Sequence, residues 1–156
     1  MFDRVLVGYD GSAPARRACQ VASEIAARFH SVLTVIVVRP VSHTGADHYL
    51  ESLVPLGDSG IPLSALIDEV RGRAVAHGAQ RVESVFLQGE VPEALLDWLR
   101  TNPQDLVVVG SRGLSRGRRL LLGSVSSGLV AEAPCPVLVV RPTRDHHADS
   151  GEGRIQ

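Results

Sequence analysis

The chain has 156 residues, enough for one compact domain with a substantial apolar core. Its 16 basic residues nearly balance 17 acidic ones, and the resulting net charge of −1 gives no overall basic field that would favour DNA or RNA binding. No apolar run approaches the roughly 18 residues needed to cross a membrane, and the start lacks a signal-peptide pattern, so the sequence predicts a cytoplasmic protein.

Apolar runs alternate with segments of helical spacing along the chain. The predicted strands cover residues 4–8, 32–38, 82–87, 105–109 and 137–141. The predicted helices run from Ala13 to Phe29, from Leu63 to near Gly78, from Pro92 through Leu99, and from Ser124 to Ala133. Ser12 is the predicted N-cap of the first helix, with Pro14 in its first turn. Residues 40–60 show no clear period and are predicted to form a long loop.

The order of these elements predicts an α/β fold. Unbroken apolar strands separated by helices are typical of a parallel sheet covered by helices on both faces. Right-handed crossovers then restrict the topology to a doubly wound sandwich. The more polar strand at 82–87 is expected at a sheet edge. We expect one domain over residues 1–142 and a disordered tail over residues 143–156, where the apolar period is lost.

Two loops with site-like chemistry leave the carboxyl ends of predicted strands. Residues 8–12, GYDGS, follow the first strand, and residues 110–126 follow the fourth. Ligands of open α/β sheets bind beyond strand carboxyl ends at the topological switch point. Asp10 is therefore a candidate to hold ribose hydroxyls or a divalent metal that bridges phosphates.

Residues 110–126 combine features that favour phosphate binding. Gly110 and Gly113 lack Cβ atoms, so their backbone can approach an anion and adopt a positive φ, and Gly123 is expected to do the same before the helix. Four arginines offer charge-assisted contacts: Arg112, Arg116, Arg118 and Arg119. The chain contains no lysine, which excludes a lysine-based P-loop.

The predicted helix that follows Gly123 adds further donors to an anion. The amides of Ser124, Val125 and Ser126 are unpaired at a helix N-terminus, where the helix dipole is positive. The hydroxyls of Ser124 and Ser126 are also expected to donate to phosphate oxygens.

Each of these signals has a simpler interpretation. Glycines between a strand and a helix are usually required by the turn alone, and an arginine run is by default a solvated loop. Asp10, which precedes Gly11 and Ser12, is equally consistent with an Asx turn. Cys19 and Cys135 form no C-x-x-C pair and are predicted to be small buried apolar side chains.

The spacing of the second loop distinguishes between these interpretations. It follows the pattern G-x2-G-x9-G-S, from Gly110 and Gly113 to Gly123 and Ser124. This resembles the ATP-binding motif of the universal stress protein family. The resemblance covers roughly residues 2–142 and includes the stretches VGYDGS, LVVVGSRG, LLLGSVS and APCPVLVVRP.

The resemblance implies a flavodoxin-like, Rossmann-like domain of five parallel strands in the order 3-2-1-4-5 that binds ATP with Mg or Mn. Asp10 matches the family aspartate near the ribose and the phosphate-bound metal, and Val38 matches the position whose backbone contacts adenine. The phosphate-binding segment corresponds to Gly110, Gly113, Gly123, Ser124, Val125 and Ser126.

These residues lead us to expect an ATP-binding stress-response protein that acts as a nucleotide-dependent sensor or regulator of a protein partner not identified by the sequence. One alternative is slow ATP hydrolysis or self-phosphorylation on Ser124 or Ser126, although a dedicated enzyme is not indicated, because Asp10 is the one obvious carboxylate in the two loops. Another is an interaction module that does not depend on ATP.

The last predicted strand indicates how the chain self-associates. Val137–Arg141 is strongly apolar and is expected at a sheet edge, where an exposed strand invites pairing with another chain. We therefore expect a homodimer formed through this strand, which the family resemblance also implies.

Overall fold

The computed structural model describes residues 1–39, 62–111 and 122–141. Strands and helices alternate throughout these ranges. The strands are β1 (Arg4–Gly8), β2 (Val32–Arg39), β3 (Arg81–Gln88), β4 (Leu106–Gly110) and β5 (Val137–Val140). The helices are α1 (Ala13–Phe29), α3 (Leu63–Ala76), α4 (Val91–Thr101) and α5 (Ser124–Glu132). The elements match the sequence prediction: β1 and α1 have the predicted bounds, and the ends of the others differ by one or two residues. The predicted long loop at 40–60 and the predicted tail at 143–156 lie outside the described residues.

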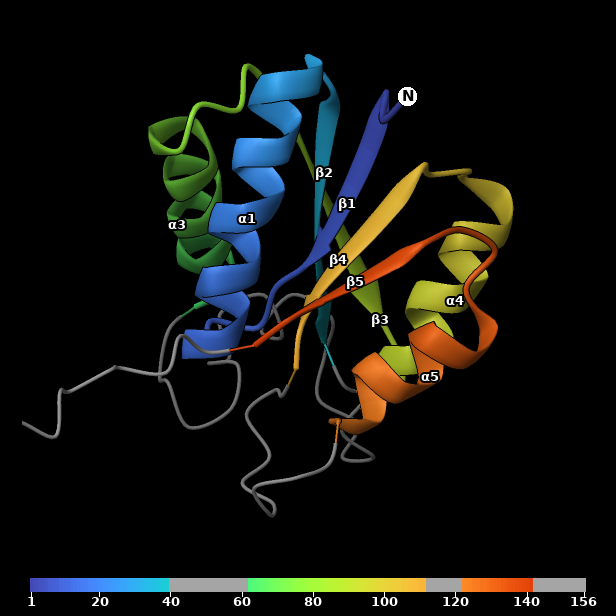
Figure 1. Cartoon of the computed structure of the whole chain (residues 1–156). Coiled ribbons are helices and arrows are strands. Elements are labelled where there is room, and N and C mark those ends of the chain that lie inside the picture. Colours follow the sequence, from blue (N-terminus) through green and yellow to red (C-terminus); the bar gives the residue numbers. More distant parts are fainter. Residues whose placement is uncertain (40–61, 112–121, 142–156) are drawn as a thin grey trace, which may run out of the picture.

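The five strands form one parallel sheet in the order β3-β2-β1-β4-β5, as the family resemblance implied. β1 is central, and its Val7 pairs with Val35 of β2 on one side and Val108 of β4 on the other. β3 lies at a sheet edge, as its polar sequence predicted. Helices α1 and α3 cover one face of the sheet and α4 and α5 cover the other (Figure 1).

Alternation along the central strands divides the core between the two faces. Val5 and Val7 of β1 belong to the cluster beneath α1 and α3, whereas Leu6 points to the cluster beneath α4 and α5. All three side chains are fully buried. This two-sided burial explains why β1 is an unbroken apolar run. Within the described ranges, no helix is long and apolar enough to span a bilayer.

The start of α1 follows the local signals of the sequence. Ser12 is the N-cap, its backbone is extended, and its Oγ accepts a hydrogen bond of 3.3 Å from the amide of Ala15. Pro14 lies in the first turn, where its missing N–H breaks no helical bond. At the other end, His30 closes α1 in the left-handed conformation (φ 56°) and donates its amide to Ala26 O.

Gly110, the last residue of β4, allows the first turn of α1 to lie directly against the sheet. A Cβ built at this position would come within 2.8 Å of both the carbonyl carbon and the Cβ of Pro14. Gly110 does not have the positive φ that the sequence analysis anticipated. The glycine is instead required by this close backbone approach.

Alanine substitutions at two glycines should therefore have opposite effects on stability. Gly110→Ala is expected to lower the free energy of unfolding by about 1–3 kcal/mol, because backbone must move to accommodate the methyl group. Gly72→Ala, within α3, is expected to raise it by about 0.5–1 kcal/mol, since a Cβ there has no described atom within 4 Å and alanine favours the helix. Urea denaturation followed by circular dichroism measures both values. Equal effects of the two substitutions would contradict the close approach at Gly110.

Candidate functional site

The two loops singled out from the sequence begin at adjacent strand ends. β1 pairs with β4 in parallel, so the turn after Gly8 and the segment after Gly110 leave the same end of the sheet. The first residues of α1 and α5 lie at that end, which is the lower one in Figure 1. The structure therefore places the carboxylate of the first loop and the helix start that follows the second at the same end of the sheet.

Asp10 forms an Asx turn, which was one of the two interpretations of this residue from the sequence. Its Oδ1 accepts a 2.9 Å hydrogen bond from the amide of Ser12. Gly11 between them has φ +81°, and a Cβ there would lie 3.1 Å from Cδ1 of Leu66. Asp10 is partly exposed, and no described residue donates to its Oδ2. One carboxylate oxygen thus shapes the turn while the other is available to a ligand.

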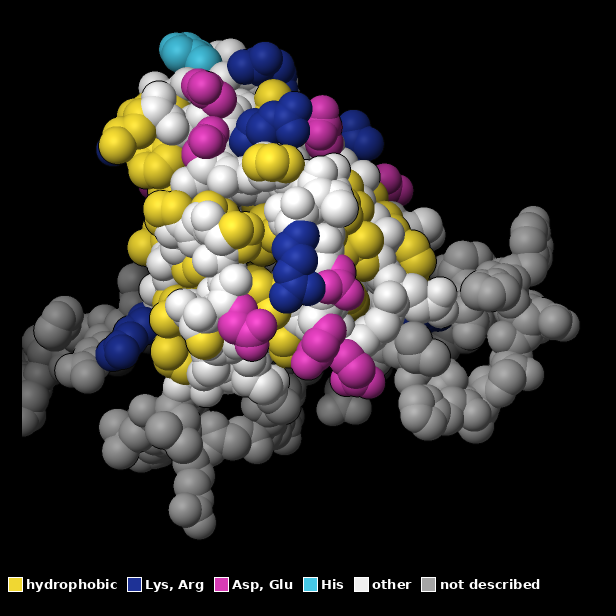
Figure 2. Space-filling model, turned by 90° about the vertical axis from the view of Figure 1, so that its right-hand side faces the viewer, with side chains coloured by type: hydrophobic (Ala, Val, Ile, Leu, Met, Phe, Trp, Pro, Cys, Tyr) yellow, Lys and Arg dark blue, Asp and Glu magenta, His cyan; other side chains and the backbone are white. Residues whose placement is uncertain are grey.

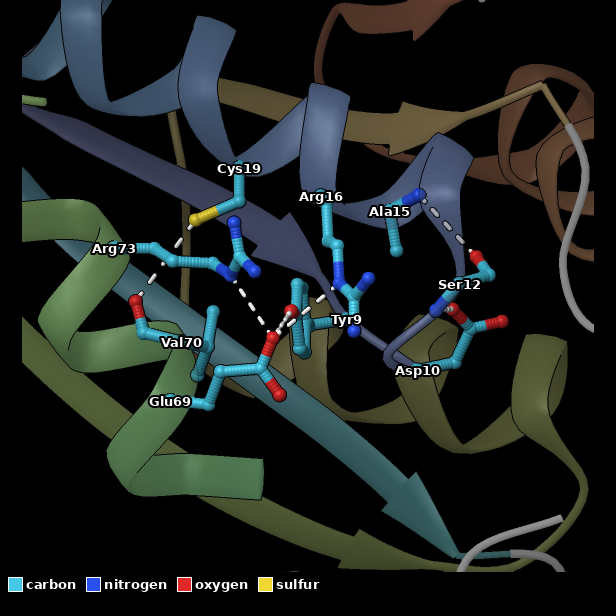
Figure 3. Close-up of polar contacts among 9 residues, drawn as sticks. All are labelled: Tyr9, Asp10, Ser12, Ala15, Arg16, Cys19, Glu69, Val70 and Arg73. Atoms are coloured by element: carbon cyan, nitrogen blue, oxygen red, sulfur yellow. Dashed lines mark hydrogen bonds and ion pairs between the residues drawn. The ribbon is translucent and has the colours of Figure 1, made fainter. Parts of the chain in front are cut away.

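Tyr9 anchors this turn to α3 (Figure 3). Its ring is buried, with 4% of the residue exposed, and its hydroxyl donates a 3.0 Å hydrogen bond to Oε1 of Glu69. The same oxygen accepts a 2.9 Å hydrogen bond from Nε of Arg73 and forms a 3.3 Å ion pair with Nε of Arg16. We call these four residues (Tyr9, Arg16, Glu69 and Arg73) the Glu69 cluster.

Two pKa shifts result from this arrangement. Burial of the Tyr9 hydroxyl, with a further contribution from the neighbouring Glu69 carboxylate, raises the pKa of Tyr9 to about 12. Burial also tends to raise the pKa of the Glu69 carboxyl, but hydrogen bonds from Arg73 and Tyr9 and the charges of Arg16 and Arg73 outweigh burial and lower it. Tyr9 therefore stays protonated as a donor, and Glu69 stays ionised as an acceptor.

Ser111 fixes the start of α5 to the end of β4. Its amide donates to Val140 O at 2.9 Å, and its carbonyl oxygen accepts from the amide of Gly123 at 2.8 Å. Gly123 is the N-cap of α5, with φ −61° and ψ 163°, an extended conformation rather than the positive φ expected from the sequence. Residues 111 and 123 are thus joined directly, and α5 begins immediately beyond the sheet.

The amides of Ser124, Val125 and Ser126 are the first backbone donors of α5. The first helical hydrogen bond runs from the amide of Ser127 to Gly123 O, so the three preceding amides have no acceptor within α5. The positive end of the helix dipole adds to their attraction for an anion. Ser124 is exposed and Val125 is half-buried. Backbone N–H groups in this position can bind a phosphate even where no cationic side chain contributes to the binding.

The hydroxyl of Ser126 does not have the environment that the sequence analysis expected. Ser126 is 1% exposed, and its Oγ lies 3.1 Å from Gly123 O and 3.3 Å from Ser111 O, both of which are acceptors. Its hydroxyl proton is therefore directed back to the protein backbone instead of outward to a phosphate. The exposed hydroxyl of Ser124 has no such constraint.

The remaining predicted site residues divide into two groups. Val38 is buried near the carboxyl end of β2 and pairs with Leu87 of β3, so its backbone lies at the same end of the sheet as Asp10. Arg112 and Gly113 lie outside the described residues, as do the other arginines of that loop. Within the ranges that the structure describes, no three His, Cys, Asp or Glu side chains gather as a metal-binding group. Asp10, the predicted metal-binding residue, follows the carboxyl end of β1 and has one carboxylate oxygen bonded to the Ser12 amide.

Sequence reasoning missed Ser111 and the Glu69 cluster. Glu69 and Arg73 are four residues apart on α3, and this helical spacing was the available signal for an ion pair. Their contact with Tyr9, which is 60 residues from Glu69 in the chain, depends on tertiary packing and leaves no local pattern.

Comparisons with known proteins agree with this fold. The model of the universal stress protein family matches residues 1–141. A universal stress protein of Thermus aquaticus is 39% identical over 144 residues, an alignment that covers 90% of this chain and all of that relative. A crystal structure of a universal stress protein in complex with cAMP superposes with a TM-score of 0.77 at 30% identity and covers 91% of this chain and 99% of that one. UspA from Lactobacillus plantarum gives a TM-score of 0.72 at 26% identity, with 90% and 98% covered.

The lowered pKa of Glu69 predicts a specific loss of stability in acid. A folded-state pKa below the unfolded value of about 4.3 means that Glu69 stabilises the fold above that pH, and that this contribution is lost as pH falls through the folded-state pKa. Glu69→Gln should therefore be less stable than the wild type near pH 7, and the difference should shrink below about pH 4.

Urea denaturation midpoints between pH 3 and pH 7 measure this effect. Glu24→Gln, which changes an exposed carboxylate on α1 that is bonded to Gln20, is the matched control and should keep the wild-type profile. A constant difference between Glu69→Gln and the wild type across this range would contradict the assigned ionisation of Glu69.

Proposed function

Because this chain belongs to the universal stress protein family, we propose that it binds ATP, with Mg or Mn, at the carboxyl ends of β1 and β4. In this proposal the protein acts as a nucleotide-dependent sensor or regulator in the stress response. A protein partner would distinguish its nucleotide-bound form from its nucleotide-free form. The observation that carries the proposal is the start of α5, where the amides of Ser124–Ser126 have no acceptor within the helix. This helix follows β4, and β4 pairs with β1, the strand that precedes Asp10.

In this proposal, different residues contact different parts of the nucleotide. The amides of Ser124, Val125 and Ser126 bind phosphate oxygens, and Gly123, which has no side chain, leaves them accessible. Gly110 allows the first turn of α1, which follows the Asp10 turn, to approach the end of β4 closely. Arg112 and Gly113 complete the phosphate-binding segment in this proposal.

The other end of the nucleotide lies over β1 and β2. The backbone of Val38 contacts adenine at the end of β2, and Asp10 contacts the ribose or the metal. Mg²⁺ is usually bound by one or two carboxylates together with substrate phosphates and water, and the free Oδ2 of Asp10 suits this role. When bound, the metal would neutralise phosphate charge in a site that contains no lysine.

A second candidate ligand is a cyclic adenine nucleotide. The relative solved in complex with cAMP is 30% identical and almost completely covered, which favours this alternative. A cyclic monophosphate needs fewer donors than a triphosphate and no metal. Titration with cAMP in place of ATP, with and without Mg²⁺, distinguishes the two ligands.

Enzymatic activity is at most a secondary property in this proposal. Among the residues that the structure describes, Asp10 is the carboxylate of the site, and one of its oxygens is already bonded to the Ser12 amide. If the protein phosphorylates itself, the exposed Ser124 is a better acceptor than Ser126, whose hydroxyl is buried. An interaction module that does not depend on nucleotide remains the alternative that the binding experiment decides.

Isothermal titration of nucleotide-stripped protein with Mg-ATP tests the ligand. The wild type should bind, whereas Gly123→Val should weaken binding by more than about tenfold, because its methyl groups occupy the space that phosphate approaches. The extended φ of Gly123 tolerates valine, so the fold should survive. Gly72→Ala, on the exposed surface of α3, is the control and should bind as the wild type does. Absence of heat with the wild type at tens of micromolar protein would refute nucleotide binding.

We also propose that the chain forms a homodimer through β5. This strand lies at the edge of the described sheet, and Leu138 on β5 and Val130 on α5 are 36% and 54% exposed. Figure 2 shows apolar side chains exposed on the face that carries α4 and α5. Pairing of β5 with a second copy would satisfy its edge and cover these side chains.

Sedimentation equilibrium tests this assembly. The wild type should have twice the 16.7 kDa mass of one chain at micromolar concentration, and Leu138→Glu should shift it to the single-chain mass. Phe86→Glu is the matched control, because Phe86 is 41% exposed on β3 at the opposite edge of the sheet, and it should remain dimeric. A single-chain mass for the wild type would contradict the dimer.

A further inference from the structure

One carboxylate oxygen joins three separate segments beside the proposed metal-binding residue. Oε1 of Glu69 on α3 accepts from Tyr9 in the β1–α1 turn at 3.0 Å, pairs with Arg16 of α1 at 3.3 Å and bonds to Arg73 of α3 at 2.9 Å. These residues converge on Glu69 in Figure 3, and Asp10 lies immediately beyond Tyr9. No step of nucleotide binding described above uses this cluster.

Tyr9 is held at both ends. Its amide donates a 2.9 Å hydrogen bond to Ile36 O of β2, and its hydroxyl is bonded to Glu69 on α3. The buried ring between these bonds has little freedom to move. The peptide that leads into Asp10 is therefore fixed by contacts with two elements that are distant in sequence.

The same helix also supports the other side of the turn. Cδ1 of Leu66, one turn before Glu69 on α3, lies against Gly11. Glu69 and Leu66 thus hold the residues that flank Asp10, and the Asp10 carboxylate is oriented between them by its bond to the Ser12 amide. Asp10 thus lies between Tyr9 and Gly11, both of which contact α3.

We propose that Glu69 is a positioning residue for Asp10, acting through Tyr9 to keep the free carboxylate oxygen directed at the metal of the bound nucleotide. This inference rests on the proposed function, since it assigns a role within that same site. It also implies the reciprocal effect: binding of the metal–nucleotide complex strengthens the docking of α3 onto the β1–α1 turn.

The test compares nucleotide affinity with and without metal. Tyr9→Phe removes only the hydroxyl and Glu69→Ala removes the acceptor, while Glu24→Ala removes an exposed carboxylate of α1 as the matched control. We expect both cluster variants to bind ATP roughly tenfold more weakly in Mg²⁺, the size of effect typical for residues that orient a metal ligand. Their affinity in EDTA should equal that of the wild type, because the amides of α5 are unchanged.

A second comparison separates positioning from general stability. If Glu69 acts through Asp10, then Tyr9→Phe in an Asp10→Asn background should cause no further loss of Mg-ATP affinity. Equal losses in Mg²⁺ and EDTA, additive losses in the double variant, or wild-type affinity in both cluster variants would each overturn the proposal. Tyr9→Phe keeps the test valid if Glu69→Ala does not fold.

Hydrogen exchange provides a readout that does not require nucleotide. The Ser12 amide, bonded to Asp10, should exchange about tenfold faster in Tyr9→Phe than in the wild type or Glu24→Ala, whereas core amides of β1 should exchange at unchanged rates. Failure of the wild type to bind ATP would refute the proposed function, and the exchange result would still decide the positioning role. An unchanged rate at Ser12 would overturn it.

Discussion

The parallel pairing of β1 with β4 is the constraint on which the rest of this site depends. Val5–Val7 pair with Leu106–Val108, so the two strands end together and release their following segments at one end of the sheet. The helices that begin there lie on opposite faces, α1 on one and α5 on the other. The Asp10 carboxylate and the amide donors of α5 therefore lie at the same end of the sheet, where the strand order changes direction. Ligand sites of open α/β sheets generally lie at such a point.

Under the proposed function, anion recognition depends on the backbone more than on side chains. The amides at the start of α5 are oriented by the Gly123–Ser111 hydrogen bond and by the Ser126 hydroxyl, which is bonded to the protein itself. Backbone donors held in this way need no rearrangement to bind an anion, so little conformational entropy is lost. A chain without lysine can bind an anion through such backbone amides, because the N-terminus of the helix supplies the positive potential.

Features that depend on neighbouring residues in the chain could be predicted from the sequence, whereas contacts created by tertiary packing could not. Strands such as β1 and β4 were recognisable because burial on both faces requires continuous apolar residues, and the Ser12 cap was recognisable from its neighbours. The role of Gly110 was misjudged, since a glycine required by the proximity of Pro14 looks the same in sequence as one required by a turn or a ligand. The contact between Tyr9 and Glu69 was invisible for the same reason: it exists only once α3 is docked.

The hydrogen bond between Ser111 and Gly123 has a consequence for how this protein can vary. It joins the two ends of the segment 112–121 directly, so the start of α5 is held in place by residues outside that segment. Doubling the number of residues between two joined positions adds only about 0.6 kcal/mol to the entropic cost of closure. Insertions or exchanges within this segment can therefore leave the start of α5 in place, which makes the segment a natural position for diversification and for engineering.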